Sequence, residues 1–319
     1  MSVAFLFPGQ GSQAVGMGKA LAGSFQSARE VFDEVDSVLG DRLSTIMWEG
    51  PIEKLTLTEN TQPALVAVSM AAMRVLVTEA GVDLKRVAQF VAGHSVGEYA
   101  ALAATGALSL ADAVRLVRAR GRAMQQAVPV GVGAMAALLG VEYDQAAAIA
   151  SEAAQGEIVA AANDNGGGQV VVSGHKAAVE RAVEIAKAKG VRRAMMLPVS
   201  APFHSALMRP ASEVMRAELA KVKIRPPSVP LVANVLAAPT SDPAQIVRGL
   251  VDQVAGTVRW RESILFMAQR GVNTFYEVGS GKVLSGLVKR IAEGAVGVSV
   301  GGPGDIAAAK DALAAAKSA

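Results

Sequence analysis

The sequence predicts an α/β fold with a mostly parallel sheet, interrupted by a smaller unit of mixed structure. Two apolar runs, residues 3–7 and 87–92, predict buried strands, because a turn and then a helical tract follow each one. The first run ends at a Pro-Gly turn, and the second leads through residues 93–97 into a helix. Strands that alternate with helices are typical of a parallel sheet.

The middle of the chain has a different order of elements. We expect strand, helix, strand, strand, helix and strand at residues 133–140, 143–154, 158–162, 169–172, 176–189 and 193–197. A turn rich in Asn and Gly, residues 163–168, joins the second strand to the third. This βαββαβ order is that of a ferredoxin-like unit. We therefore expect a small subdomain at residues 128–198, inserted into a large one formed by residues 1–127 and 199–319.

The rest of the chain returns to the large subdomain. Residues 274–278 predict another strand of the main sheet. The tail from Ala307 is rich in Ala and Lys and predicts one helix.

Composition excludes several classes of function. The 319 residues include 31 Lys and Arg against 28 Asp and Glu, a net charge of +3, which is too small for a typical nucleic-acid binder. The absence of cysteine excludes disulfides, zinc thiolate sites and a cysteine nucleophile. No charged leader and no run of about 18 uncharged apolar residues stands out, so we expect a cytoplasmic protein with no membrane partner.

A candidate nucleophile stands between the second predicted strand and its helix. Gly93-His94-Ser95-Val96-Gly97 matches the G-x-S-x-G nucleophile elbow of α/β-hydrolase-like domains. Such a turn exposes the serine hydroxyl and directs the Val96 N–H at an oxyanion formed on an attacked carbonyl. A purely structural turn between strand and helix is the alternative.

A serine nucleophile needs a base, and the chain offers three histidines. His94 is expected to point away from Ser95 and to serve packing. His175, in a polar turn, is expected to lie at the surface. His204 lies in a loop restricted by two prolines, which suits a catalytic group, although an ordinary loop histidine is equally compatible with the sequence.

Arg120 is singled out by helical geometry. On a helix over residues 110–126, it falls about 60° from the centre of the apolar face, whereas Arg115, Arg118 and Arg122 fall opposite and predict a solvated stripe. A buried guanidinium needs an anionic partner, either a structural carboxylate or a substrate carboxylate. Periodicity leaves both open.

Two glycine-rich loops match nucleotide-binding motifs poorly. Residues 9–14 lack the acid that follows a dinucleotide fingerprint, and residues 279–283 lack the first glycine and the Ser/Thr of a P-loop.

Together these segments resemble the malonyl-CoA:acyl carrier protein transacylases and related acyltransferase domains. The resemblance runs through Phe7-Pro8-Gly9-Gln10-Gly11-Ser12-Gln13, Thr61-Gln62-Pro63-Ala64, Gly93-His94-Ser95-Val96-Gly97-Glu98-Tyr99, Arg118-Ala119-Arg120-Gly121, Pro202-Phe203-His204-Ser205 and Glu277-Val278-Gly279. This set, in this order, spans nearly the whole chain.

The resemblance implies a role for each candidate residue. Ser95 would be the nucleophile, His204 its base and Arg120 the partner of the malonyl carboxylate. Gln10 and Val96 would form the oxyanion hole. Gln253 lies in the segment whose backbone carbonyl would orient the histidine in place of an acid.

The implied reaction carries a malonyl group from malonyl-CoA to the phosphopantetheine thiol of acyl carrier protein in fatty acid biosynthesis. It needs no cofactor and no metal of the chain's own. Three alternatives share part of the pattern: an acyltransferase of a polyketide synthase or malonate decarboxylase system, a serine thioesterase or hydrolase, and a noncatalytic carrier-binding module.

Overall fold

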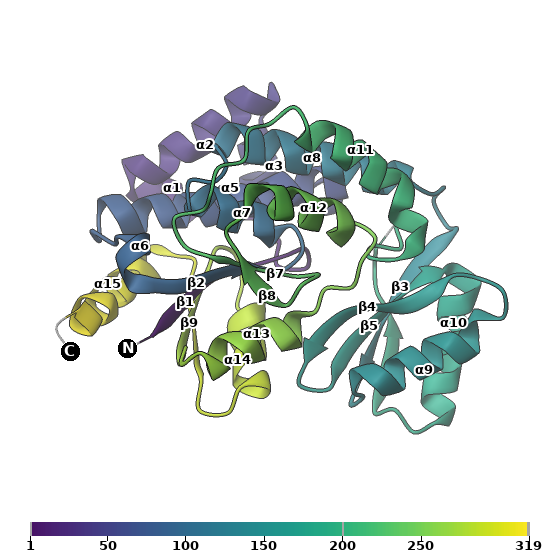
Figure 1. Ribbon diagram of the computed structural model, residues 1–319. Coiled ribbons are helices and arrows are strands. Elements are labelled where there is room, and N and C mark those ends of the chain that lie inside the picture. The colour runs from purple at the N-terminus through teal and green to yellow at the C-terminus, as the bar shows by residue number, and fades with distance from the viewer. Residues whose placement is uncertain (1, 200, 318–319) are drawn as a thin grey trace.

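The computed structural model describes residues 2–199 and 201–317, and a six-stranded sheet forms its centre (Figure 1). The strand order is β10-β9-β1-β2-β7-β8. Strand β1 (Val3–Phe7) lies between β2 (Ala88–Gly93) and β9 (Thr274–Val278), parallel to both. The pairs β9–β10 and β2–β7 are also parallel, and only β8 runs antiparallel to its neighbour; the outer strands are β10 (Val296–Val300), β7 (Leu231–Ala233) and β8 (Ala238–Thr240). The mostly parallel α/β sheet is therefore confirmed.

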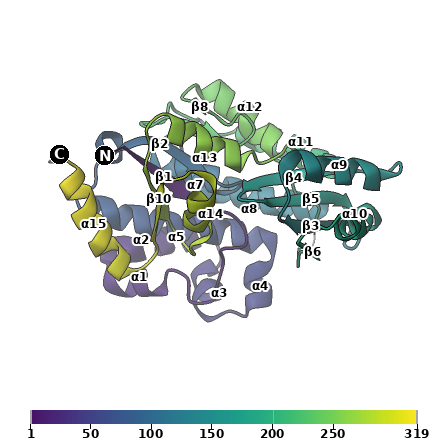
Figure 2. The same ribbon diagram turned by 90° about the horizontal axis from the view of Figure 1, so that it is seen from below.

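Alternation along β1 explains why helices cover both faces of this sheet. Val3, Phe5 and Phe7 point to one face, and Ala4 and Leu6 point to the other; all five are buried. The first face packs mainly against the N-terminal helices, and the second packs against α13 (Trp260–Gln269) and α14 (Val283–Ile291) (Figures 1 and 2).

The helices of the first face come from several parts of the chain. They are α1 (Lys19–Ser24), α2 (Gln26–Leu39), α3 (Leu43–Glu49), α4 (Ile52–Thr56), α5 (Thr58–Thr78), α7 (Gly97–Ala104), α8 (Leu110–Gln126), α11 (Arg209–Leu219) and α12 (Pro243–Gln253), with α15 (Pro303–Lys317) at the edge. The short α6 (Leu84–Val87) precedes β2, and the 3₁₀ turn η1 (Ala206–Met208) precedes α11.

Helix α5 packs in the middle of these helices. Within the described residues it is the one helix long and apolar enough to cross a membrane, and 83% of its most apolar window is buried inside the protein. Its contacts with α8 and α2 account for that burial. Length and hydropathy alone therefore do not distinguish this core helix from a span.

A second sheet of four antiparallel strands lies beside the first (Figure 1). Its order is β4-β5-β3-β6, formed by β3 (Gly133–Leu139), β4 (Val159–Gly166), β5 (Gln169–His175) and β6 (Arg193–Met196). Helices α9 (Tyr143–Ala154) and α10 (Lys176–Ala188) cover it and share one apolar core with it. The six predicted elements of this region are present in the predicted order.

One boundary in this region was predicted wrongly. Residues 163–166 of the expected turn belong to β4, which continues to Gly166, and only residues 167–168 form the turn. Two register shifts along the β4–β5 pairing accommodate the polar residues without ending the strand. Asp164 is buried there, accepts a hydrogen bond from Arg261, and donates its N–H to the Val258 carbonyl. The polar run therefore joins the small sheet to the segment before α13.

Candidate active site

Ser95 occupies a sharp turn between β2 and α7. Its φ is 51°, in the left-handed region that non-glycine residues seldom adopt. The two flanking glycines are required by close packing: a Cβ on Gly93 would lie 1.9 Å from the Gly97 carbonyl carbon, and one on Gly97 would lie 2.2 Å from the Phe7 oxygen. The backbone thus has the tight geometry of the predicted elbow.

Asn234, which directly follows β7, holds this turn from the adjacent strand. Its Oδ1 accepts a hydrogen bond of 2.7 Å from the Ser95 N–H. Its Nδ2 donates one of 2.7 Å to the Gly93 carbonyl. Sequence reasoning missed Asn234, because its place in the site depends on the pairing of β7 with β2, which residue patterns do not reveal.

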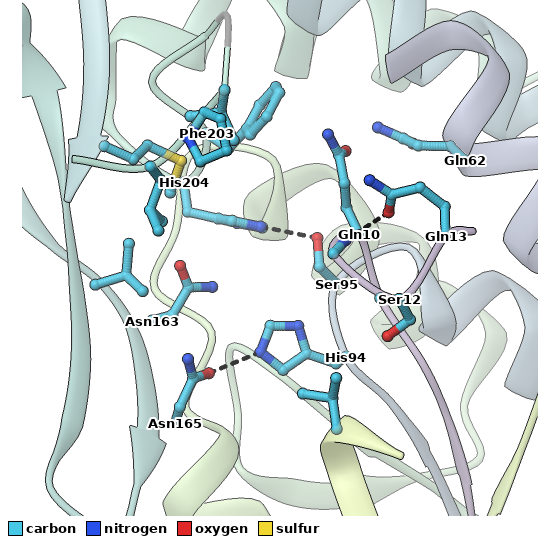
Figure 3. Close-up of a pocket in the computed structure, with 18 of the residues that line it drawn as sticks. Gln10, Ser12, Gln13, Gln62, His94, Ser95, Asn163, Asn165, Phe203 and His204 are labelled. Atoms are coloured by element: carbon cyan, nitrogen blue, oxygen red, sulfur yellow. Dashed lines mark hydrogen bonds between the residues drawn. The ribbon is translucent and has the colours of Figure 1, made fainter. Parts of the chain in front are cut away.

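His204 lies within hydrogen-bonding distance of the serine. Its Nε2 is 2.8 Å from Ser95 Oγ (Figure 3). Its Nδ1 is 2.8 Å from the Gln253 carbonyl and 3.1 Å from the Gly256 carbonyl. Carbonyl oxygens only accept, so Nδ1 carries the proton and Nε2 is left to accept from the serine hydroxyl. Among the described residues no carboxylate contacts this histidine, which agrees with the expectation of carbonyl orientation.

Burial is the main reason that the His204 pKa is lowered from 6.5 to about 3, and the positive charge of Arg120 adds to the effect. The hydrogen bond with the Gln253 carbonyl acts in the opposite direction. The imidazole is therefore neutral near pH 7, which is the form that can accept a proton.

Arg120 extends from α8 into the same site and is only 1% exposed. Its Nη1 donates 2.9 Å to Gln62 Oε1, and its Nη2 donates 2.8 Å to Gln253 Oε1 and 3.1 Å to Ser95 Oγ. Its Nε has no partner, and no salt bridge to it occurs in the part of the chain that the structure describes. The structural salt bridge that the sequence left open is thus not formed.

The prediction for Arg118 was wrong. It was assigned to a solvated stripe, but it is 7% exposed, donating to Asn60 Oδ1 at 2.6 Å and to Asp41 at 2.9 Å. The reason is that α2 and the segment after it cover this side of α8, which periodicity within one helix cannot show. Arg115 and Arg122 are exposed, as expected.

A cavity of about 640 Å³ brings the candidate residues together between the two sheets. Ser95, Arg120, His204 and Gln10 line it, together with residues of the small sheet such as Asn163. Figure 3 shows Gln10, Ser95, Asn163 and His204 around it. Among the described residues, the backbone N–H groups of Gln10 and Val96 have no hydrogen-bond acceptor. Two backbone donors therefore remain available at the start of α7 and at the end of β1.

The other two histidines differ in their relation to this cavity. His94 was expected only to pack, but it lines the cavity, its Nε2 lies 2.9 Å from Asn165 Oδ1, and its ring lies 5.4 Å from that of Trp260. Burial lowers its pKa. The hydrogen bond with Asn165 of the small sheet holds the His94 ring at the cavity. His175 lies outside the cavity lining and accepts a hydrogen bond from the Ile158 N–H.

Sequence reasoning also missed Glu98, the second residue of α7. It is buried among apolar neighbours in a helix of sequence Gly-Glu-Tyr-Ala-Ala-Leu-Ala-Ala. Burial raises its pKa, whereas hydrogen bonds from Asn234 and Gln253 and the charge on Arg120 lower it. N–H donors face both of its oxygens, and this geometry fits the ionised carboxylate. A single carboxylate within a helix of apolar residues was the signal that could have identified it.

Comparisons with known proteins agree with this arrangement. Residues 4–301 match the family model described as acyl transferase domain. The malonyl CoA-acyl carrier protein transacylase of Escherichia coli K12 is 46% identical over 306 residues, covering 96% of this chain and 98% of the relative. That of Bacillus subtilis is also 46% identical, over 91% of this chain and 90% of the relative.

Solved structures show the same likeness. The acyl-carrier-protein S-malonyltransferase of Bartonella henselae has a TM-score of 0.96 at 53% identity, over 98% of this chain and 100% of that one. A malonyl-transacylase solved with a type II PKS acyl-carrier protein has a TM-score of 0.94 at 40% identity, over 98% of this chain and 100% of that one. The chain therefore belongs to the acyl transferase family, and within it to the malonyl CoA-acyl carrier protein transacylases.

Proposed function

We propose that this chain transfers a malonyl group from malonyl-CoA to the phosphopantetheine thiol of acyl carrier protein, through a malonyl ester on Ser95, in fatty acid biosynthesis. The observation that carries the proposal is the contact of both His204 and Arg120 with Ser95 Oγ, at 2.8 and 3.1 Å. The base His204 and the cation Arg120, which has no carboxylate partner among the described residues, both contact the same hydroxyl. A substrate that has a thioester and a carboxylate two bonds apart suits that pair.

The first half-reaction loads the enzyme. Ser95 Oγ attacks the malonyl thioester carbonyl while its proton passes to His204 Nε2. The N–H groups of Gln10 and Val96 stabilise the oxyanion. The carbon–sulfur bond then breaks, and the imidazolium returns its proton to the departing CoA sulfur. In the second half-reaction the carrier thiol gives its proton to His204 and attacks the carbonyl of the Ser95 ester. The ester carbon–oxygen bond breaks, and His204 returns the proton to Ser95 Oγ.

Arg120 gives the site its acyl selectivity. Its Nε and Nη atoms bind the malonyl carboxylate in two places, which a planar guanidinium does well. Gln253 supports this role, since its side-chain oxygen accepts from Nη2 and its backbone carbonyl accepts from His204. The absence of an acid behind His204 suits the reaction, because a thiolate leaves more readily than an amine.

The partners are acyl carrier protein and malonyl-CoA, with CoA as the product. The chain contributes no cofactor, because phosphopantetheine belongs to the carrier, and we place the enzyme in the cytoplasm. The solved malonyl-transacylase that binds a type II PKS acyl-carrier protein supports a carrier partner here. That likeness also favours a second candidate function, malonyl loading of a polyketide carrier by the same residues.

We also propose finer divisions of the fold. Residues 1–127 and 199–319 form an α/β-hydrolase-like subdomain, and the elbow at Ser95 supports that assignment. Residues 128–198 form a ferredoxin-like subdomain, and the strand order β4-β5-β3-β6 supports it.

Intact-mass measurement tests the proposed function. The protein is mixed separately with malonyl-CoA, methylmalonyl-CoA and acetyl-CoA, and Ser95→Ala serves as the control. We expect a malonyl mass gain that is absent in Ser95→Ala and is removed by added carrier. Parallel initial-rate plots should accompany it. A mass gain that water removes without carrier would indicate a hydrolase, and no gain would indicate a noncatalytic module.

A further inference from the structure

The Glu98 carboxylate occupies the centre of a hydrogen-bond network behind the reacting residues. It is 2% exposed, and the backbone N–H of Asn234 donates 2.6 Å to its Oε1. The side-chain amide of Gln253 donates to its Oε2. Both oxygens therefore face donors, and none of the hydrogen bonds of this carboxylate is made with Ser95, His204 or Arg120.

The first branch of this network leads to the elbow. Asn234, whose backbone Glu98 binds, accepts the Ser95 N–H at 2.7 Å and donates to the Gly93 carbonyl at 2.7 Å. Ser95 is held at a φ of 51°, which surrounding contacts must maintain. Glu98 fixes the residue that supplies two of those contacts.

The second branch leads to His204 and Arg120 through Gln253. The Gln253 Nε2 faces Glu98 and also donates 3.0 Å to the Ser95 carbonyl. The amide is thereby oriented with Oε1 toward Arg120, and the backbone carbonyl of the same residue accepts from His204. An amide turned the other way would present its NH₂ to a guanidinium that can only donate.

We propose that Glu98 is a positioning residue, which fixes Asn234 and Gln253 and through them sets the places of Ser95, His204 and Arg120. The inference rests on the proposed function for the identity of the acyl group, but its contacts with the Ser95–His204 pair do not depend on that identity. Glu98 thus acts on Ser95 through Asn234 and on His204 through Gln253, and it makes no direct contact with either of them.

The competing view is that Glu98 merely satisfies a polar group in the core. Glu98→Gln separates the two views, because it keeps the size of the side chain but replaces one carboxylate oxygen, an acceptor, by an NH₂ group, a donor. In either orientation that NH₂ meets a donor, from Gln253 or from Asn234. A purely structural role would change stability alone, whereas a positioning role changes loading in the folded protein.

Glu277→Gln provides a matched control. Glu277 on β9 is also fully buried, and both of its oxygens accept backbone N–H groups, from Leu284 at 3.0 Å and from Ser285 at 2.7 Å. It has no hydrogen bond to Gln253 or Asn234 among the described residues. We expect this variant to lose stability and to keep its loading rate per folded molecule.

The experiment measures single-turnover loading of Ser95 by quench and intact mass, together with thermal melting. In Glu98→Gln we expect a folded protein whose loading at saturating malonyl-CoA falls about 10- to 100-fold, as for a small displacement of reacting groups. The KM for malonyl-CoA should rise as well, because Arg120 loses its orienting acceptor. Wild-type loading in folded Glu98→Gln would overturn the proposal.

Glu98→Asp keeps the question open to test if Glu98→Gln does not fold. It retains the acceptors and shortens the side chain, so we expect slower loading with a melting temperature near that of the native chain. Wild-type loading in a folded Glu98→Asp would contradict the proposal, and failure of both variants to fold would assign Glu98 to stability and overturn it.

A neutral probe separates this inference from the proposed function. Phenylmethanesulfonyl fluoride forms a sulfonyl ester on Ser95 Oγ with loss of fluoride, the proton passing to His204, and it needs neither CoA nor a carboxylate. If the native chain takes no malonyl group but Glu98→Gln slows sulfonylation, the proposed function fails and the inference holds for the Ser95–His204 pair. If the native chain is malonylated and Glu98→Gln matches it with both reagents, the inference alone fails.

Discussion

Arg120 Nη2 donates a hydrogen bond of 3.1 Å to Ser95 Oγ, so the buried cation touches the atom that we propose as the nucleophile. The carboxylate site and the acylation site therefore adjoin each other. The carboxylate of a malonyl group lies two bonds from the reacting carbonyl, so Arg120 can bind that carboxylate directly beside the atom where the ester forms. An acetyl group leaves the same guanidinium buried without an anion.

Arg120→Ala should change acyl selectivity. A malonyl carboxylate without its partner in this buried site costs several kcal/mol, so malonyl loading should fall steeply. Acetyl loading should hold steady or rise, because the variant no longer buries an unpaired cation. Arg120→Lys should restore only part of the malonyl activity, since an ammonium lacks the planar two-point contact.

Loading rates with malonyl-CoA and acetyl-CoA, compared at equal folded fraction, check this prediction. An equal loss for both acyl groups, or an unfolded Arg120→Ala, would make Arg120 a structural residue instead.

His204→Ala should slow the loading of Ser95 by about 10² to 10⁴, as expected when a general base is lost. The fold should persist, because the variant removes one side chain from the wall of a cavity. Rapid-quench loading with circular dichroism as the folding control measures the effect. A rate unchanged from that of the native chain would remove His204 from the mechanism.

The lowered pKa of His204 predicts an unusual pH profile. The base must be neutral, and a pKa of about 3 keeps it neutral far below the ordinary value of 6.5. The kcat/KM for loading should therefore stay nearly flat from pH 7.5 to 5, whereas an unshifted imidazole would lose about 30-fold.

The lowered pKa of His204 also makes the stability of the folded protein depend on pH. Below about pH 6.5 the unfolded chain binds a proton at His204, whereas the folded chain does not until about pH 3. The stability of the folded protein is therefore lost as the pH falls from about 6.5 toward 3. Loading must therefore be compared at pH values where circular dichroism shows the protein folded. A midpoint near 6.5 in that folded range would contradict the assigned pKa.

Gly93→Ala should disrupt the elbow. The added Cβ would lie 1.9 Å from the Gly97 carbonyl carbon, so the backbone must move, at a cost of about 1–3 kcal/mol or more. Loading should fall together with the melting temperature.

Gly286→Ala is the matched control for Gly93→Ala. It lies within α14, and a Cβ there meets nothing within 4 Å. Replacing a helical glycine by alanine should stabilise the protein by about 0.5–1 kcal/mol. If the two variants behave alike in melting and loading, close packing is not the reason for glycine at position 93.

The sequence predicted the elements well wherever the local pattern decides them. Helices α8 and α9 and strands β1 and β9 have the predicted bounds, because hydrophobic periodicity reflects burial within a single element. The predicted bounds of β4 were too short, because its polar residues form their hydrogen bonds with β5 and with Arg261, which lie elsewhere in the chain. Arg118 was misplaced for the same reason, since its partners Asn60 and Asp41 come from elsewhere in the chain.

The site shows a similar division. Ser95, His204, Arg120 and Gln253 were proposed from motifs, and the structure joins them by hydrogen bonds. Asn234 lies in no quoted motif. Glu98 lies in the segment 93–99 that carries the resemblance, but its contacts with Asn234 and Gln253 follow from how β7 and α7 pack in three dimensions. Residues that act on the substrate leave a local signature, whereas residues that hold them in place depend on the completed fold.

Ser95 and His204 both have a left-handed backbone, with φ values of 51° and 57°. Each such residue costs the native state about 1–3 kcal/mol relative to a relaxed conformation. Glycine would relieve that cost at both positions and would abolish the proposed chemistry at each. Selection for thermal robustness alone would therefore drive this chain toward an inert relative, because at these two positions the proposed chemistry requires side chains that the backbone conformation disfavours.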